Sequence, residues 1–199
     1  NPKNTWRVEM KMEALNNYKK LYMNELTKVK SFYKSWPFWK EKINLYIPTI
    51  KGEYLFNLGD NLRDIFFTTN TGRDQSGVSS AGTAWECLVT WYLNLIFWDT
   101  PVIAMKQNKK FIPQVIYDCT TVTIANNSTN TESDIVLFTV PNPQSFLGSK
   151  SSELNEFIKD NLSKIDLNII QCKTNWADNA QIPMLWDLVY NSEVNLDFV

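Results

Sequence analysis

The sequence predicts a mixed α/β fold, with a central, mostly antiparallel or mixed β-sheet flanked by helices. In the first part of the chain and again over 82–97, apolar residues recur at three- and four-residue steps, as in amphipathic helices. Between 102 and 140, short apolar and β-branched runs alternate with polar turns, which is typical of antiparallel strands. The chain lacks the regular strand–helix alternation of a parallel sheet.

Helices are expected in the N-terminal part. Residues 8–34 form the first helix, which ends at Trp36-Pro37 because the residue before a proline avoids the helical conformation. A short second helix is expected over 38–47. Residues 68–83 are polar and contain three glycines, so they predict a long loop.

The next helix runs from about 82 to 97, with Thr83 as its N-cap. The C-terminal part then predicts most of the sheet and two more helices. Ser152 is expected to cap the first of these helices, and Pro183 suits the first turn of the last one. The expected strands cover 102–105, 111–117, 120–125, 135–140 and 167–172, with polar turns at 106–110 and 126–131.

Composition excludes several kinds of chemistry. The 199 residues include no histidine, so Ser-His-Asp, Cys-His and histidine-metal mechanisms are excluded. Catalysis must then use carboxylates, Lys, Tyr, Ser or a metal bound by oxygen, which favours magnesium, manganese or calcium. Three widely spaced cysteines without a CxxC pair fit a reducing cytoplasm and argue against zinc. The sequence contains no P-loop and no GxGxxG motif, so it does not predict a nucleotide cofactor. It contains no apolar run of 18 residues, so it does not predict a membrane-spanning helix.

Charge divides the chain into two regions. Residues 1–51 carry eleven Lys or Arg and four Asp or Glu, whereas residues 52–199 carry nine and seventeen. We therefore expect a basic helical region packed on a core formed by 52–199, as one structural domain overall. The basic region indicates an anionic partner. A solvated, lysine-rich helical face explains the same pattern.

Polar residues lie where two apolar strands end. Asp134 directly precedes Ile-Val-Leu-Phe, and Gln171-Cys172-Lys173 ends the strand that begins at 167. Because strand side chains alternate, Gln171 and Lys173 project from one face and Cys172 from the other. If the strands are neighbours, oxygens of Asp134, Gln171 and the Cys172 backbone converge on a divalent ion. Lys173 would then orient, or help deprotonate, a water that attacks a phosphate.

This pattern resembles the PD-(D/E)XK nuclease superfamily. Asp134 matches its first Asp, Gln171-Cys172-Lys173 stands in place of Glu-x-Lys, and Glu86 matches the Glu of its preceding helix. The resemblance covers roughly 82–190 and implies a restriction endonuclease-like core. It further implies a type II restriction endonuclease that cuts double-stranded DNA with Mg²⁺, or Mn²⁺ as substitute, leaves a 5′-phosphate and acts as a homodimer. The neutral Gln171 departs from the family pattern and should bind metal less tightly than Glu.

Two polar segments are candidates for contacting DNA. Arg73 and Gln75 lie in the expected loop, and Asn175, Trp176 and Asn179 follow the Gln-x-Lys segment. Amides can read adenine and arginine can read guanine. Ordinary loops explain both segments equally.

Alternatives remain at the candidate site. Asp118 competes with Asp134 as the acid of the sheet, and Gln107-Asn108-Lys109 is a second Gln-x-Lys sequence. Asp134 can also be a turn residue, Glu86 the polar side of a helix, and Gln171 with Lys173 a strand end that reaches solvent. A structure-specific repair or junction nuclease, a non-catalytic nucleic-acid-binding module and a purely structural domain are the competing functions.

Overall fold

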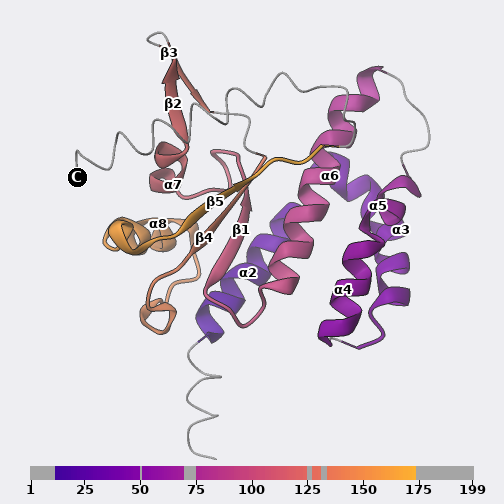
Figure 1. Ribbon diagram of the computed structural model, residues 1–199, viewed down its shortest axis with the longest axis horizontal. Helices are drawn as coiled ribbons and strands as arrows, with labels where there is room; N and C mark the ends of the chain where they lie inside the picture. The colour runs from indigo at the N-terminus through magenta and orange to yellow at the C-terminus, as the bar shows by residue number, and fades with distance from the viewer. Residues whose placement is uncertain (1–11, 50, 70–74, 125–126, 131–133, 174–199) are drawn as a thin grey trace, which may run out of the picture.

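Helices fill the first half of the chain and the sheet lies in the second half (Figure 1). The computed structural model describes residues 12–49, 51–69, 75–124, 127–130 and 134–173, with the backbone alone at 75–79, 122–124 and 127–130. The helices are α2 (Glu13–Leu26), α3 (Lys30–Tyr46), α4 (Gly52–Asp60), α5 (Leu62–Phe67), α6 (Gln75–Ile96), α7 (Gln114–Cys119) and α8 (Ser151–Lys159). Two short 3-10 helices cover Pro143–Ser145 and Leu162–Lys164.

The main sheet has three antiparallel strands in the order β1-β4-β5. These strands are β1 (Val102–Lys106), β4 (Ile135–Thr139) and β5 (Leu167–Ile170), so β4 lies in the middle. β2 (Thr121–Ile124) and β3 (Asn127–Asn130) form a separate antiparallel pair. Helices flank the sheet (Figure 1). The predicted mixed α/β class with an antiparallel sheet is therefore confirmed.

Side-chain oxygens bind the outward-pointing N–H groups of β1. The backbone N–H groups of alternate residues point away from β4, and each donates to a side-chain oxygen. The pairs are Val102 to Thr100 Oγ1 at 3.3 Å, Ala104 to Asn94 Oδ1 at 3.2 Å and Lys106 to the Tyr22 hydroxyl at 2.7 Å. Asn94 Nδ2 also donates to the Ala104 carbonyl at 2.7 Å. These bonds occupy groups that an edge strand otherwise offers to another strand, and they fix α2 and α6 against β1.

A buried lysine joins α2 to the end of α6. Lys19 is fully buried, and its ammonium donates to the carbonyls of Phe97 at 2.6 Å and Thr100 at 2.7 Å. Helix C-termini leave carbonyls without intrahelical partners and carry a partial negative charge, which a cation stabilises. Burial lowers the pKa of Lys19 to about 8, while the nearby Asp99 carboxylate opposes that shift. Lys19 thus has a structural role.

The predicted boundary at Trp36-Pro37 was wrong. The first helix, α2, ends earlier, at Leu26, and α3 then continues from Lys30 through the exposed Pro37. Proline removes one helical hydrogen bond, but the aromatic residues around it are held by packing. Phe32 and Trp39 are fully buried, and Trp36 stacks on Phe32 with ring centroids 5.0 Å apart. Of the expected helix over 8–34, residues 8–11 lie outside the described residues.

The predicted loop over 68–83 was also wrong in its second half. α6 begins at Gln75, so Thr83 lies inside the helix and is not its N-cap. The predicted turn over 126–131 mostly forms β3, which pairs with β2. The expected helix at Ser152 is α8, but its N-cap is Lys150, two residues before the predicted cap, and Ser152 lies inside the helix.

The predicted strand over 111–117 is instead α7, which begins directly after Pro113. Within α7 Ile116 is fully buried, whereas Gln114 and Asp118, two positions away on either side, are exposed. The helix expected after Pro183 lies outside the described residues. No helix in the described part of the chain is long and apolar enough to cross a membrane.

Candidate active site

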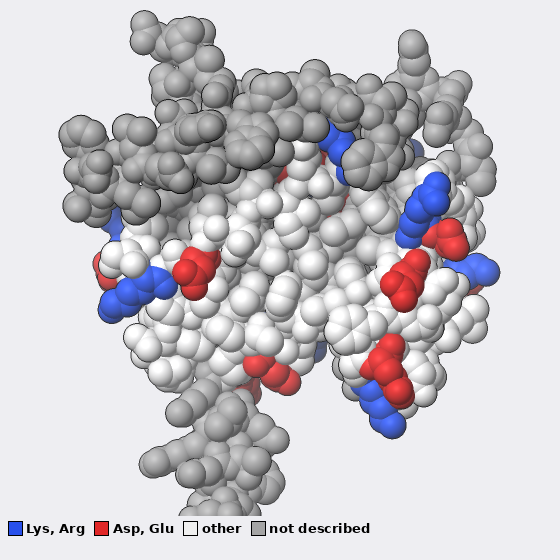
Figure 2. All heavy atoms as spheres, viewed as in Figure 1, with Lys and Arg blue, Asp and Glu red and all other residues white. Residues whose placement is uncertain are grey.

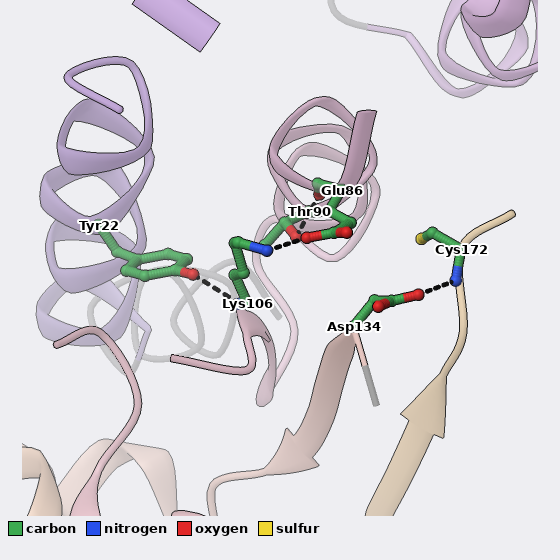
Figure 3. Close-up of polar contacts among 6 residues, drawn as sticks. All are labelled: Tyr22, Glu86, Thr90, Lys106, Asp134 and Cys172. Carbon is green, nitrogen blue, oxygen red and sulfur yellow. Dashed lines mark hydrogen bonds and ion pairs between the residues drawn. The ribbon is translucent and has the colours of Figure 1, made fainter. Parts of the chain in front are cut away.

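The ends of β4 and β5 bring Asp134 beside the Gln-x-Lys segment. The two strands pair from Phe138 opposite Leu167 to Ile135 opposite Ile170, so Asp134 continues the register towards Gln171. The Cys172 backbone N–H donates to Asp134 Oδ2 at 2.6 Å (Figure 3). The carboxylate thereby fixes a segment that follows the last paired residue of β5.

The end of β1 lies at the same edge of the sheet. Lys106 pairs with Ile135, and the next residue, Gln107, donates its backbone N–H to the Asp134 carbonyl at 3.0 Å. Asp134 is therefore held on both sides, by its backbone towards β1 and by its carboxylate towards the Cys172 backbone. The ends of β1, β4 and β5 therefore meet at Asp134.

Glu86 approaches this edge from α6. The apolar side chains of Val89 and Leu93 pack against Ala104 and Leu137 of the sheet, which places Glu86 one turn earlier, over the end of β1. There its carboxylate forms an ion pair with the Lys106 ammonium (Figure 3). The side chains of Lys106 and Glu86 are only 13% and 18% exposed.

Burial shapes the electrostatics of the site. It raises the pKa of Asp134, while the Cys172 N–H, Lys106 and Lys173 oppose that shift. It lowers the pKa of Lys106, and the Asp134 carboxylate opposes that shift in turn. Burial and the Asp134 charge raise the pKa of the Cys172 thiol to about 12. The thiol is therefore neutral at physiological pH, and Cys172 can offer a hard cation only its backbone carbonyl.

Gln171 and Lys173 differ in exposure. Gln171 is half-buried, whereas Lys173 is exposed. Lys173 nevertheless lies close enough for its positive charge to lower the pKa of Asp134. The structure thus gathers Asp134, Gln171, Cys172 and Lys173 at one place, with Glu86 held nearby by Lys106.

No family model, curated protein or solved structure matches this chain. Its function is therefore inferred from the residues at the end of the sheet.

These residues fit a hydrated Mg²⁺ or Mn²⁺ better than a fully protein-ligated metal. Asp134, the Gln171 amide and the Cys172 carbonyl are hard oxygen donors, and Mg²⁺ usually binds one or two carboxylates while it keeps several waters. Glu86 is occupied by Lys106. Within the described ranges, no group of three or more His, Cys, Asp or Glu side chains is arranged to bind a metal.

The competing acid and the second Gln-x-Lys sequence lie in other settings. Asp118 lies on α7 rather than at a strand end, is exposed, and accepts a hydrogen bond from Gln114 Nε2 at 2.6 Å. The Lys109 ammonium lies over the Tyr117 ring, 5.0 Å from its centroid. Only Gln107 of that second sequence contacts the candidate site, through its backbone bond to Asp134.

The expected DNA-contacting residues are not placed by the structure. Arg73, Asn175, Trp176 and Asn179 lie outside the described residues. Gln75 is the first residue of α6, and its side chain lies outside them as well.

Sequence reasoning missed Lys106. It was assigned to the polar turn over 106–110, but it is the last residue of β1 and its ammonium lies among the carboxylates of the site. The available signal was a lysine that directly ends the apolar run Val-Ile-Ala-Met.

Proposed function

We propose that this chain is a metal-dependent deoxyribonuclease that hydrolyses phosphodiester bonds of double-stranded DNA, as a type II restriction endonuclease does. One observation carries the proposal, namely the Asp134 carboxylate bonded to the backbone of the Gln171-Cys172-Lys173 segment at 2.6 Å. With Glu86 on the preceding helix, the acid, the amide and the lysine follow the order of the PD-(D/E)XK pattern.

Asp134, Gln171 and the Cys172 carbonyl would hold Mg²⁺ in this proposal. The bound ion supplies a lowered pKa for a coordinated water and charge stabilisation for the phosphate. Asp134 suits this role because its carboxylate is desolvated and its Oδ2 is already oriented by the Cys172 N–H. An oriented carboxylate binds a cation without first losing side-chain freedom.

In this proposal two lysines, Lys106 and Lys173, share the functions of the single lysine in the PD-(D/E)XK pattern. Lys173 is exposed, so it is suited to contact a phosphate that arrives from solvent. Lys106 is mostly buried and its ammonium is held at the end of β1, so it is suited to orient the attacking water. Glu86 acts as a positioning residue, because its ion pair holds the Lys106 ammonium at the end of β1.

In this proposal the basic N-terminal region binds the DNA backbone. Exposed lysines of α2 and α3 would neutralise backbone phosphates. Basic and acidic side chains are interspersed over the face drawn in Figure 2, so this face shows no continuous basic surface. Cutting both strands symmetrically requires two active sites, and a homodimer is part of the proposal.

Cleavage of supercoiled plasmid DNA tests the proposal. The wild-type protein with Mg²⁺ should convert the plasmid to discrete linear fragments, whereas EDTA and Asp134→Asn should each abolish cleavage. Asp118→Asn is the matched control and should cleave normally, because Asp118 lies on α7. Cleavage that persists in EDTA, or is lost equally in both variants, would refute the assignment. A smear instead of bands would refute sequence specificity alone.

A further inference from the structure

A groove between α3, α5 and α6 lies apart from the end of the sheet. It has a volume of about 930 Å³, within the range of ligand sites. Its described lining combines lysines and hydroxyl groups, and none of these described residues is acidic. The lining is Val29, Lys30, Ser31, Lys34, Ser35, Phe38, Thr68, Thr69, Ser80, Ala81, Thr83 and Ala84.

Three residues of α3 form one wall of this groove. Lys30, Lys34 and Phe38 are spaced by four residues, so they lie on one face of the helix over about 12 Å. Both lysines are exposed, and neither forms an ion pair with a described carboxylate. The Phe38 ring is 60% exposed.

The first turn of α3 adds groups that bind anions. α3 has 17 residues and begins at Lys30, and no side chain caps it. Its first N–H groups therefore lack intrahelical partners and carry the positive end of the helix dipole. The Ser31 hydroxyl is buried and has no hydrogen-bond partner within the described part of the chain. A buried hydroxyl without a partner is unfavourable, and a phosphate oxygen in the groove would satisfy it.

Hydroxyl groups also line the opposite side. Thr69 Oγ1 donates to Ser35 Oγ at 3.1 Å across the groove wall, and Ser80 and Thr83 come from α6. Lysines and hydroxyls without a carboxylate suit phosphate rather than a cation. Phosphate alone would not use an exposed phenyl ring, whereas an unpaired base stacks on one.

We propose that this groove binds single-stranded nucleic acid. Backbone phosphates lie on Lys30, Lys34 and the first turn of α3, and one base stacks on Phe38. α6 links the groove to the candidate active site, since Thr83 lines the groove and Glu86 follows three residues later on the same helix. If the nuclease proposal also holds, the substrate has an unpaired segment beside the cleaved bond. The groove itself requires no cleavage.

Fluorescence anisotropy with a labelled single-stranded oligonucleotide in EDTA tests the groove independently of catalysis. Lys30→Ala/Lys34→Ala should weaken binding at least about 10-fold and reduce the salt slope by about 1.4, or about 0.7 per phosphate. Lys159→Ala/Lys164→Ala is the matched control, because it removes the same charge from exposed positions outside both the groove and the basic N-terminal region. This control should bind like the wild type.

Phe38→Ala should weaken binding by about 5-fold or more without changing the salt slope, and Phe38→Trp should retain it. Equal effects of the groove and control lysine pairs would overturn the proposal, as would equal affinity for a duplex of the same sequence. Competition with inorganic phosphate at equal ionic strength provides a further test. If phosphate displaces the oligonucleotide and Phe38→Ala binds like the wild type, the groove is a site for small phosphates and the proposal is overturned. Far-UV circular dichroism of each variant verifies that the helices are intact.

Discussion

The Asp134 carboxylate accepts a hydrogen bond from the Cys172 backbone N–H at 2.6 Å, across the ends of two strands. The hydrogen-bond acceptor of this N–H is thus a carboxylate whose ionised form is disfavoured by burial, which raises the pKa of Asp134. An arrangement that costs stability in the free protein is typical of a site that binds a ligand. The predictions below separate this functional role from a purely structural one.

Asp134→Asn should remove metal-dependent cleavage without lowering stability at pH 7. The amide oxygen can still accept a hydrogen bond from the Cys172 N–H, and the partly buried charge is removed. We expect nuclease activity to fall by about 100-fold or more, while the midpoint of urea unfolding stays equal or rises. A structural role for the charge predicts the opposite, a lower midpoint in urea at pH 7.

The pH dependence of stability should report the raised pKa of Asp134. A carboxyl whose pKa is higher in the folded than in the unfolded protein contributes stability below its unfolded value of 3.8, and this contribution is lost as the pH rises through the folded value. The wild type should therefore lose stability relative to Asp134→Asn as the pH rises above about 4. Urea unfolding of both proteins from pH 3.5 to 7 measures the difference, and a constant difference would contradict the assignment.

The Glu86–Lys106 ion pair should behave as a coupled, mostly buried unit. Lys106→Met leaves the Glu86 carboxylate without its cation and should cost about 3 kcal/mol of unfolding free energy. The double variant Glu86→Gln/Lys106→Met should recover much of that loss, because no buried charge remains. Urea unfolding of the two single variants and the double variant gives the coupling. Additive losses would show that the two side chains act independently.

Activity should distinguish Lys106 from Lys173. In the proposed scheme Lys106→Met lowers the rate of the chemical step, and Glu86→Gln shifts the pH–rate profile because Glu86 positions Lys106. Lys173→Ala should mainly raise KM, since the exposed Lys173 contacts the phosphate. Single-turnover and steady-state cleavage at several pH values provide these readouts. An unchanged profile for Glu86→Gln would remove the positioning role.

Lys19→Met should destabilise the fold by about 2 kcal/mol, because it removes the charged donor that the carbonyls of Phe97 and Thr100 share. Lys20→Met is the control, since Lys20 is the exposed neighbour on α2. Thermal unfolding of both variants measures the effect. Equal melting temperatures for the two variants would show that the buried ammonium is not needed to join α2 and α6.

Local patterns explain which elements the sequence could predict. β1, β4 and β5 are apolar runs bounded by polar residues, and their positions were predicted within a few residues. α7 was mistaken for a strand because six residues are too few to reveal a helical period. Pro37 ended a helix in the prediction, but burial of Phe32 and Trp39 holds α3 together across it.

The candidate site was predictable only in part, because local sequence patterns do not specify which strands and helices pack together. Asp134 and Gln171 each adjoin an apolar strand, so their meeting followed once those strands were assumed to be neighbours. The place of Lys106 depends on β1 pairing with the other side of β4, which no local pattern specifies. The groove beside Lys30 is formed by three helices that pack together, and sequence periodicity does not reveal which faces meet.

Titration with Mn²⁺, followed by electron paramagnetic resonance of the free ion, tests the central claim most directly. The wild-type protein should bind Mn²⁺ at neutral pH and more weakly as Asp134 becomes protonated, because a metal ligand must be deprotonated. Asp134→Asn should lose this binding, and Asp118→Asn should keep it. Equal Mn²⁺ binding by the wild type and a folded Asp134→Asn variant would contradict a metal site at the end of the sheet.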